Sequence, residues 1–192
     1  MDKRAENLIK AWQERNISGF YCATKEGALE QILKIIPESC SVGFSGSVTL
    51  EQLGVIKALE VRGNKVFNHN IPGITQAENL VLRRRGVQEA DYYLASANAI
   101  SQNGELVFLS AWGNRTAGIS YAKNTIVVSG INKITPDLES AIKRAREFAT
   151  PLNYKRLDWP QDKRMRCQFL IIEAEVAPDR LKVILVGQEL GF

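Results

Sequence analysis

Between residues 91 and 133, groups able to bind an anion follow the ends of three successive predicted strands. They are four amides, two cations and a glycine: Asn98, Asn103, Gly113, Asn114, Arg115, Asn132 and Lys133. In an open α/β sheet, ligands bind beyond the carboxyl ends of the strands. We therefore expect these residues to bind a ligand, and their chemistry predicts a small anionic metabolite.

The two cations offer different chemistry. Arg115 carries a planar guanidinium that matches a carboxylate or a phosphate, and Gly113 permits close approach of the backbone. The alternative for Arg115 is an ordinary solvated surface arginine. Lys133 is either an electrostatic clamp or, if buried, an amine of lowered pKa, and the sequence leaves both open. For Asn103 with Gly104, a plain hairpin turn is the structural alternative.

A second candidate anion site is the Gly/Ser segment of residues 43–49, which contributes Ser45, Gly46, Ser47 and Thr49. A strand that turns through such a loop into a helix presents backbone N–H groups and the positive end of a helix dipole. The segment has neither the lysine of a P-loop nor the glycine spacing of a dinucleotide fold. The structural alternative is a tight turn with a helix cap, for which Thr49 is the expected N-cap residue of a helix over 50–62.

His69 is the single histidine of the chain and follows a predicted strand over 65–68, so we count it among the candidate ligand-binding residues. The competing interpretation is a loop histidine bonded to backbone. No G-x-S-x-G elbow and no pair of carboxylates accompany it. Cys22, Cys40 and Cys167 are far apart and form no metal-ligand pattern. The sequence thus predicts no metal site, no cofactor motif and no readable catalytic mechanism.

Composition narrows the class of protein. The chain has 192 residues, 45% of them hydrophobic and 24% charged, with a net charge of +4, which is typical of a globular protein. Its basic runs lack the interleaved aromatic residues of single-strand binders, so we expect no nucleic-acid partner. No apolar stretch is long enough to span a membrane, and no signal peptide is recognisable. The expected location is the cytoplasm, and an amphipathic helix near the N-terminus hints at a homo-oligomer.

Strand and helix patterns alternate along the chain and predict βαβ units with a mainly parallel sheet. The expected helices cover residues 3–15, 25–36, 50–62, 75–88 and 136–149, with Thr75 and Glu78 in capping-box spacing; the expected strands cover 19–23, 40–44, 65–68, 92–95, 106–109, 125–129, 168–174 and 182–186. We predict a single domain over 1–192, with an N-terminal helical segment (1–37) and an α/β core (38–192). Its fold is a three-layer α/β/α arrangement with an antiparallel C-terminal hairpin at one edge.

Several segments together resemble the lactate-utilisation (LUD) domain family: GFSGSVT at 43–49, the run from Arg83 to Gly104, GNR at 113–115, INKI at 131–134 and VILVGQELGF at 183–192. The resemblance covers the chain from about residue 5 onward. It implies a NagB/RpiA/CoA-transferase-like fold, whose other members bind anionic ligands. It also implies a role in lactate or hydroxy-acid utilisation, as an accessory component beside iron–sulfur oxidoreductase subunits.

The chain departs from the sequence patterns of related proteins in two places, and these departures limit the functions that the resemblance implies. At the place where coenzyme A transferases have a nucleophilic glutamate, this chain has Gln102, which cannot form the thioester intermediate. Many short family members have several cysteines between the last helix and the final strands, whereas this chain has only Cys167 there, which alone cannot hold a cluster or a zinc ion. The alternative function is a stand-alone transferase, isomerase or ligase acting on a phosphorylated or CoA-linked substrate.

Overall fold

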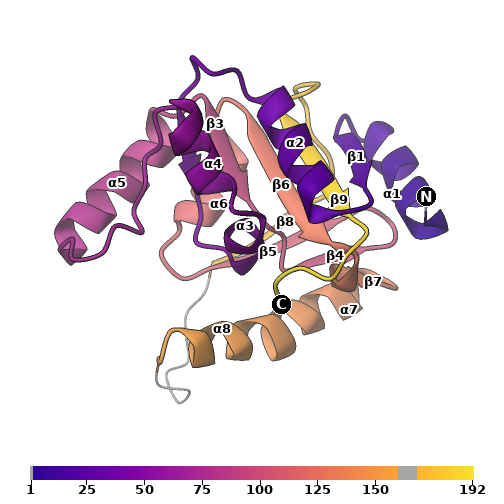
Figure 1. The fold of residues 1–192 in the computed structure, drawn as a ribbon. Coiled ribbons are helices and arrows are strands. Elements are labelled where there is room, and N and C mark those ends of the chain that lie inside the picture. Colours follow the sequence, from indigo (N-terminus) through magenta and orange to yellow (C-terminus); the bar gives the residue numbers. More distant parts are fainter. Residues whose placement is uncertain (1, 160–167) are drawn as a thin grey trace.

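The computed structural model describes residues 2–159 and 168–192. Its centre is a five-stranded sheet of order β1-β9-β6-β3-β2 in which every neighbouring pair is parallel (Figure 1). The strands are β1 (Ser18–Cys22), β2 (Val42–Phe44), β3 (Tyr92–Ala95), β6 (Thr125–Gly130) and β9 (Leu181–Val186). The predicted parallel α/β architecture is confirmed.

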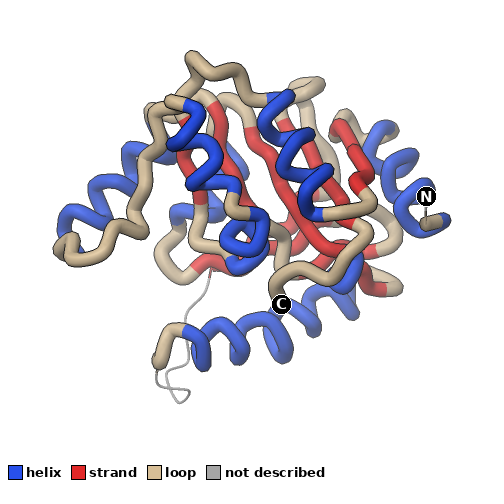
Figure 2. Tube along the Cα trace, viewed as in Figure 1, coloured by secondary structure: helices blue, strands red, loops and turns tan. Residues whose placement is uncertain are grey.

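Alternate residues of the central strands bury opposite faces of this sheet. On β6, Val127 packs on one side with Trp12 of α1 (Lys3–Gln13) and Ile119 of α6 (Asn114–Tyr121). Its neighbours Ile126 and Val128 pack on the other side with α2 (Lys25–Ile35), α3 (Val48–Leu53) and α4 (Val55–Arg62). A strand buried on both faces has apolar residues in succession, as β6 does at Ile126–Val128. Helices therefore cover the sheet on both sides, as Figure 2 shows, and the three-layer prediction is confirmed.

A smaller mixed sheet of order β7-β4-β5-β8 packs beside the first. It consists of β4 (Ala99–Ser101), β5 (Leu106–Ser110), β7 (Ile134–Thr135) and β8 (Gln168–Ile172). The predicted C-terminal hairpin is wrong, because its two strands enter different sheets. β8 pairs antiparallel with β5, while β9 lies between β1 and β6 and pairs parallel with both. Two parallel neighbours give β9 more hydrogen-bond partners than an edge position next to β8 would.

Several helices differ from the predicted ranges. The helix expected over 50–62 is two helices, α3 and α4, joined at Gly54, whose φ of 64° interrupts the helical backbone. The helix expected over 136–149 is α7 (Leu138–Lys143), continuing through a π-helical segment η2 (Arg144–Ala149) into α8 (Thr150–Arg156). The strand expected over 65–68 is one isolated bridge between Val66 and Val42. Helix α5 (Gln76–Gln88) has the predicted capping box of Thr75 and Glu78.

The parallel sheet brings four chain segments to one edge. β2, β3 and β6 end at Phe44, Ala95 and Gly130, and β9 ends at Val186. Because parallel strands share one carboxyl edge, the residues that follow them converge there. In Figure 1 the C-terminal residues run between α3 and the α7–α8 segment at this edge. Among the described helices, none is long and apolar enough to cross a membrane.

Candidate functional site

A pocket of about 260 Å³ lies at the carboxyl edge of the central sheet. Its inner wall is formed by residues that follow β2, β3, β6 and β9, and its outer wall by α8 and by the loop after β5. Eight of the twelve residues predicted to bind a ligand line it: Ser45, Gly46, Ser47, Thr49, Asn98, Asn114, Arg115 and Lys133. Their positions make a common site possible, and their ligand roles remain predictions.

Lys133 forms the innermost polar cluster of the pocket with two hydroxyl groups. It belongs to the 3-10 turn η1 (Ile131–Lys133) and is only 3% exposed. Its Nζ donates hydrogen bonds to Thr49 Oγ1 at 2.9 Å and to Ser96 Oγ at 2.7 Å, and Ser96 Oγ donates to Thr49 Oγ1 at 3.1 Å. It forms no salt bridge with any described carboxylate. A buried ammonium held only by hydroxyls is costly unless an anion joins it.

Burial and like charges set the protonation of this lysine. Desolvation is the largest cause, and the positive charges of Arg115 and Arg144 add to it, so that the pKa of Lys133 falls to about 7. Of the two roles the sequence left open, the structure therefore has the buried amine of lowered pKa. At neutral pH both protonation states are populated, and an anion in the pocket favours the charged one.

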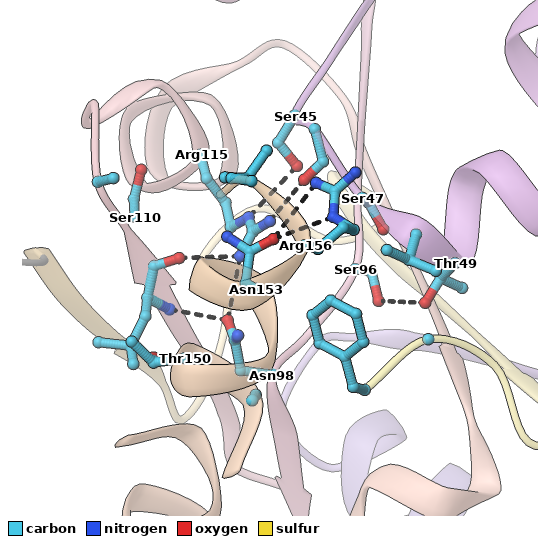
Figure 3. Close-up of a pocket in the computed structure, with 18 of the residues that line it drawn as sticks. Ser45, Ser47, Thr49, Ser96, Asn98, Ser110, Arg115, Thr150, Asn153 and Arg156 are labelled. Carbon is cyan, nitrogen blue, oxygen red and sulfur yellow. Dashed lines mark hydrogen bonds between the residues drawn. The ribbon is translucent and has the colours of Figure 1, made fainter. Parts of the chain in front are cut away.

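Arg115 connects the walls of the pocket. Its Nη1 donates to the carbonyl of Leu109 at 2.8 Å and to Asn98 Oδ1 at 3.1 Å. Its Nη2 donates to the carbonyl of Gly46 at 2.7 Å, and its Nε to Ser45 Oγ at 3.4 Å. Figure 3 shows the guanidinium between Ser45 and Asn98. Arg115 thus contributes positive charge and holds three candidate ligand residues, Ser45, Gly46 and Asn98, a structural role that the sequence did not predict.

The turn after β2 differs from its prediction in one residue. Ser47, not Thr49, is the N-cap of α3, because its Oγ accepts a hydrogen bond from the backbone N–H of Leu50 at 3.4 Å. Thr49 lies inside the helix and its hydroxyl faces Lys133 instead. Because α3 has only six residues, its helix dipole is not a candidate anion site, and the candidate groups of this turn are its side chains.

The outer wall contains residues that the sequence did not single out. Arg156 of α8 donates to Glu51 at 3.4 Å in a partly exposed ion pair, and Arg83 of α5 also lines the pocket. Trp112, Tyr154 and Trp159 form an aromatic mouth, with the two tryptophan rings 6.5 Å apart edge to face. These residues come from two helices and from loops far apart in the sequence, so no local motif indicated them. The run of polar and aromatic residues at 153–159 was the one available signal.

Three of the remaining predicted residues have structural partners outside the pocket lining. Asn103 lies in the turn between β4 and β5, where its N–H donates to Ser101 Oγ at 3.1 Å. Gly113 precedes α6 with a φ of 78°, and a Cβ there would lie 2.9 Å from the Gln168 side chain. Asn132 accepts a hydrogen bond from Leu190 N at 3.1 Å and thereby holds the C-terminal segment that does line the pocket.

His69, the fourth, is also absent from the pocket lining. It is 2% exposed and its ring stacks on Phe44 with centroids 4.4 Å apart. Neither ring nitrogen has a hydrogen-bond partner among the described residues. Burial, followed by the positive charge of Arg83, lowers the pKa of His69 to about 3, while the backbone of Phe67 acts in the opposite direction. The imidazole is therefore neutral at physiological pH and behaves as an aromatic core residue.

The described residues contain no group of three or more histidine, cysteine or acidic side chains arranged to hold a metal ion. Cys167 lies outside the described residues. The chemistry that the pocket offers comes from guanidinium, amine, hydroxyl and amide groups. These groups suit recognition of a carboxylate or phosphate and the transfer of protons near one amine.

The fold and the pocket place the protein among mainly parallel α/β/α proteins with a site at the carboxyl edge of the sheet. The sequence model of the LUD domain matches residues 5–186, and the chain belongs to the LUD domain family. A DUF162 family protein from Deinococcus radiodurans has a similar structure, with a TM-score of 0.54 and 14% sequence identity over 96% of this chain and 98% of that chain. At this identity the match shows a shared fold. A comparison with curated proteins found no significant match.

Proposed function

We propose that this protein acts in the utilisation of lactate or a related hydroxy acid by binding a small anionic metabolite in the pocket at the carboxyl edge of the sheet. Membership of the LUD domain family supports the metabolic role. The proposal makes the chain an accessory component that works beside iron–sulfur oxidoreductase subunits. A homo-oligomer is compatible with it.

The observation that carries the proposal is the excess of positive charge in the pocket. Arg83, Arg115, Lys133 and Arg156 all line it, whereas Glu51 is the one acidic side chain among the described lining residues. Among the residues that the structure describes, the partners of Arg156 are the partly exposed Glu51 and Asn153. Exposed ion pairs contribute little stability, so this guanidinium can turn to a ligand at small cost.

The first test measures the melting temperature of the purified protein with lactate, pyruvate, sugar phosphates, CoA thioesters, and folates with ATP. A ligand present at 100 times its dissociation constant adds about 2.7 kcal/mol to the free energy of unfolding. We expect small carboxylates to raise the melting temperature.

Two arginine variants test the site of binding. Arg156→Ala should weaken the binding of small carboxylates about tenfold, because a charge-assisted hydrogen bond is lost. Arg84→Ala removes an exposed arginine outside the pocket and should not weaken it. A melting temperature unchanged by any anion would contradict the proposal.

The aromatic mouth favours a second candidate. Trp112, Tyr154 and Trp159 provide flat apolar surface that a three-carbon acid does not use. A stand-alone transferase, isomerase or ligase acting on a phosphorylated or CoA-linked substrate would place a planar group there. A melting-temperature rise confined to CoA thioesters or nucleotides, lost in Trp112→Ala, would favour this candidate over the first.

A further inference from the structure

Lys133 has a geometry that simple charge recognition does not require. The side chain is 3% exposed and its Nζ is fixed by two hydroxyls at 2.7 and 2.9 Å, yet the residue lines the pocket. An amine nitrogen has three positions besides its bond to carbon. Thr49 and Ser96 occupy two of them, which leaves one for a bond to a ligand atom.

Gly191 limits the space around the Lys133 amine. It follows β9 in the C-terminal segment with a φ of 60°. A Cβ there would lie 2.6 Å from Thr49 Oγ1 and 3.3 Å from Lys133 Nζ. The backbone of the C-terminal segment thus approaches the amine as closely as a glycine permits, so the amine faces a narrow space and not open solvent.

We propose that Lys133 condenses with the carbonyl group of a 2-oxo acid held in the pocket and forms a Schiff base. The inference rests on the proposed function. The guanidiniums that line the pocket must hold the carboxylate of the acid while the Lys133 amine reaches the keto carbon of the same molecule. A 2-oxo acid is the oxidised form of a 2-hydroxy acid, so it belongs to the same substrate class.

The condensation needs only the lysine, the 2-oxo acid and the neighbouring hydroxyl groups. The lone pair of the neutral amine adds to the carbonyl carbon, a C–N bond forms, and the carbonyl oxygen takes up a proton to give a carbinolamine. Loss of that oxygen as water, with the remaining N–H proton, gives the C=N bond. The hydroxyls of Ser96 and Thr49 contact Nζ and each other, so they can carry the protons between nitrogen and oxygen. No oxidant or reductant is needed.

The electrostatic surroundings favour this reactivity. A lysine becomes nucleophilic at neutral pH when it is desolvated or lies next to another cation. Lys133 meets both conditions through its burial and through Arg115 and Arg144, and its pKa of about 7 keeps much of the amine neutral. A carboxylate in contact with Nζ would oppose this by stabilising the ammonium. No described carboxylate forms a salt bridge with Lys133, and in the proposed complex the guanidiniums, not the amine, hold the carboxylate of the acid.

Reductive trapping tests the inference on the full-length protein. We expect pyruvate with sodium borohydride to add one reduced pyruvyl group per chain, and peptide mass spectrometry to locate it on Lys133. Lactate has a hydroxyl in place of the keto group and is the matched ligand control, which should add nothing. Lys133→Met should lose the adduct, whereas Lys182→Arg should keep it, because Lys182 is a half-buried lysine of β9 outside the pocket. Circular dichroism of each variant checks that it folds.

The outcomes separate the two proposals. Adducts on other lysines with Lys133 unmodified would overturn the Schiff base, and this result needs only the wild-type protein. Pyruvate that raises the melting temperature without any adduct would overturn the Schiff base while supporting carboxylate binding. If small carboxylates neither bind nor form an adduct, both proposals fail.

Discussion

At the scale of single residues, we expect the loss of the Arg115 side chain to destabilise the walls of the pocket. It donates four hydrogen bonds to Ser45, Gly46, Asn98 and Leu109. Arg115→Ala leaves these acceptors without their charged donor, which typically costs about 2–3 kcal/mol in the free energy of unfolding. Arg115→Lys keeps the charge but not the planar fork, so it should recover less than half of the loss. Urea unfolding of the three proteins measures both effects. A stability in Arg115→Ala equal to wild type would show that the walls do not depend on this guanidinium.

At the residue scale, only part of the candidate site could be predicted from the sequence. Strand ends in a parallel sheet share one edge, so Ser45, Asn98 and Lys133 line the same pocket, and their ligand roles stay predictions. The polarity of a residue did not distinguish residues that line the pocket from residues that stabilise turns and loops. The backbone N–H of Asn103 donates to the Ser101 hydroxyl within a turn, and the Asn132 side chain accepts from the backbone N–H of Leu190. Ser96, which directly follows β3, was missed because a serine between two alanines carries no local signal of the lysine that it contacts.

At the scale of elements, the attachment of α5 depends on a contact between two glycines. A Cβ on Gly43 of β2 would lie 2.0 Å from the carbonyl oxygen of Gly86, and Gly86 is the one buried residue of α5. Gly43→Ala should therefore displace α5 and with it Arg83, which lines the pocket. We expect lower stability, faster amide exchange in 76–88 and weaker anion binding. Gly46→Ala is the matched control for space, since nothing lies within 4 Å of its Cβ position. Unchanged amide exchange in Gly43→Ala would contradict this account of α5.

The elements themselves were predicted well where their signals are local. Capping boxes, apolar strand runs and glycine turns act within a few residues, and α2, α5, β3 and β6 came out close to prediction. Pairing was not predictable in the same way. The last two strands are adjacent in sequence and were expected to form a hairpin, but β9 gains two parallel partners in the central sheet. That choice depends on the burial of both faces of β9, which only the assembled layers provide.

At the scale of the whole molecule, two buried bases should make stability rise with pH. The pKa of His69 falls from 6.5 to about 3 on folding, and that of Lys133 from 10.5 to about 7. Between the two values of each group the unfolded chain binds more protons than the native one. The free energy of unfolding therefore rises with pH from about 3 to 6.5 through His69 and from about 7 to 10.5 through Lys133. One fully shifted group contributes a slope of about 1.4 kcal/mol per pH unit.

Two variants separate these windows. His69 faces Arg83 of α5 and stacks on Phe44, so His69→Phe keeps an aromatic ring and should flatten the acid window alone. Lys133 faces Arg115 of α6 and Arg144 of η2, and Lys133→Met should flatten the alkaline window alone. Lys182, whose pKa burial also lowers, titrates in both proteins, so the difference between them isolates Lys133. Urea unfolding across the pH range measures the slopes. A Lys133→Met protein with the wild-type slope above pH 7 would mean that the buried amine is not the group that titrates there.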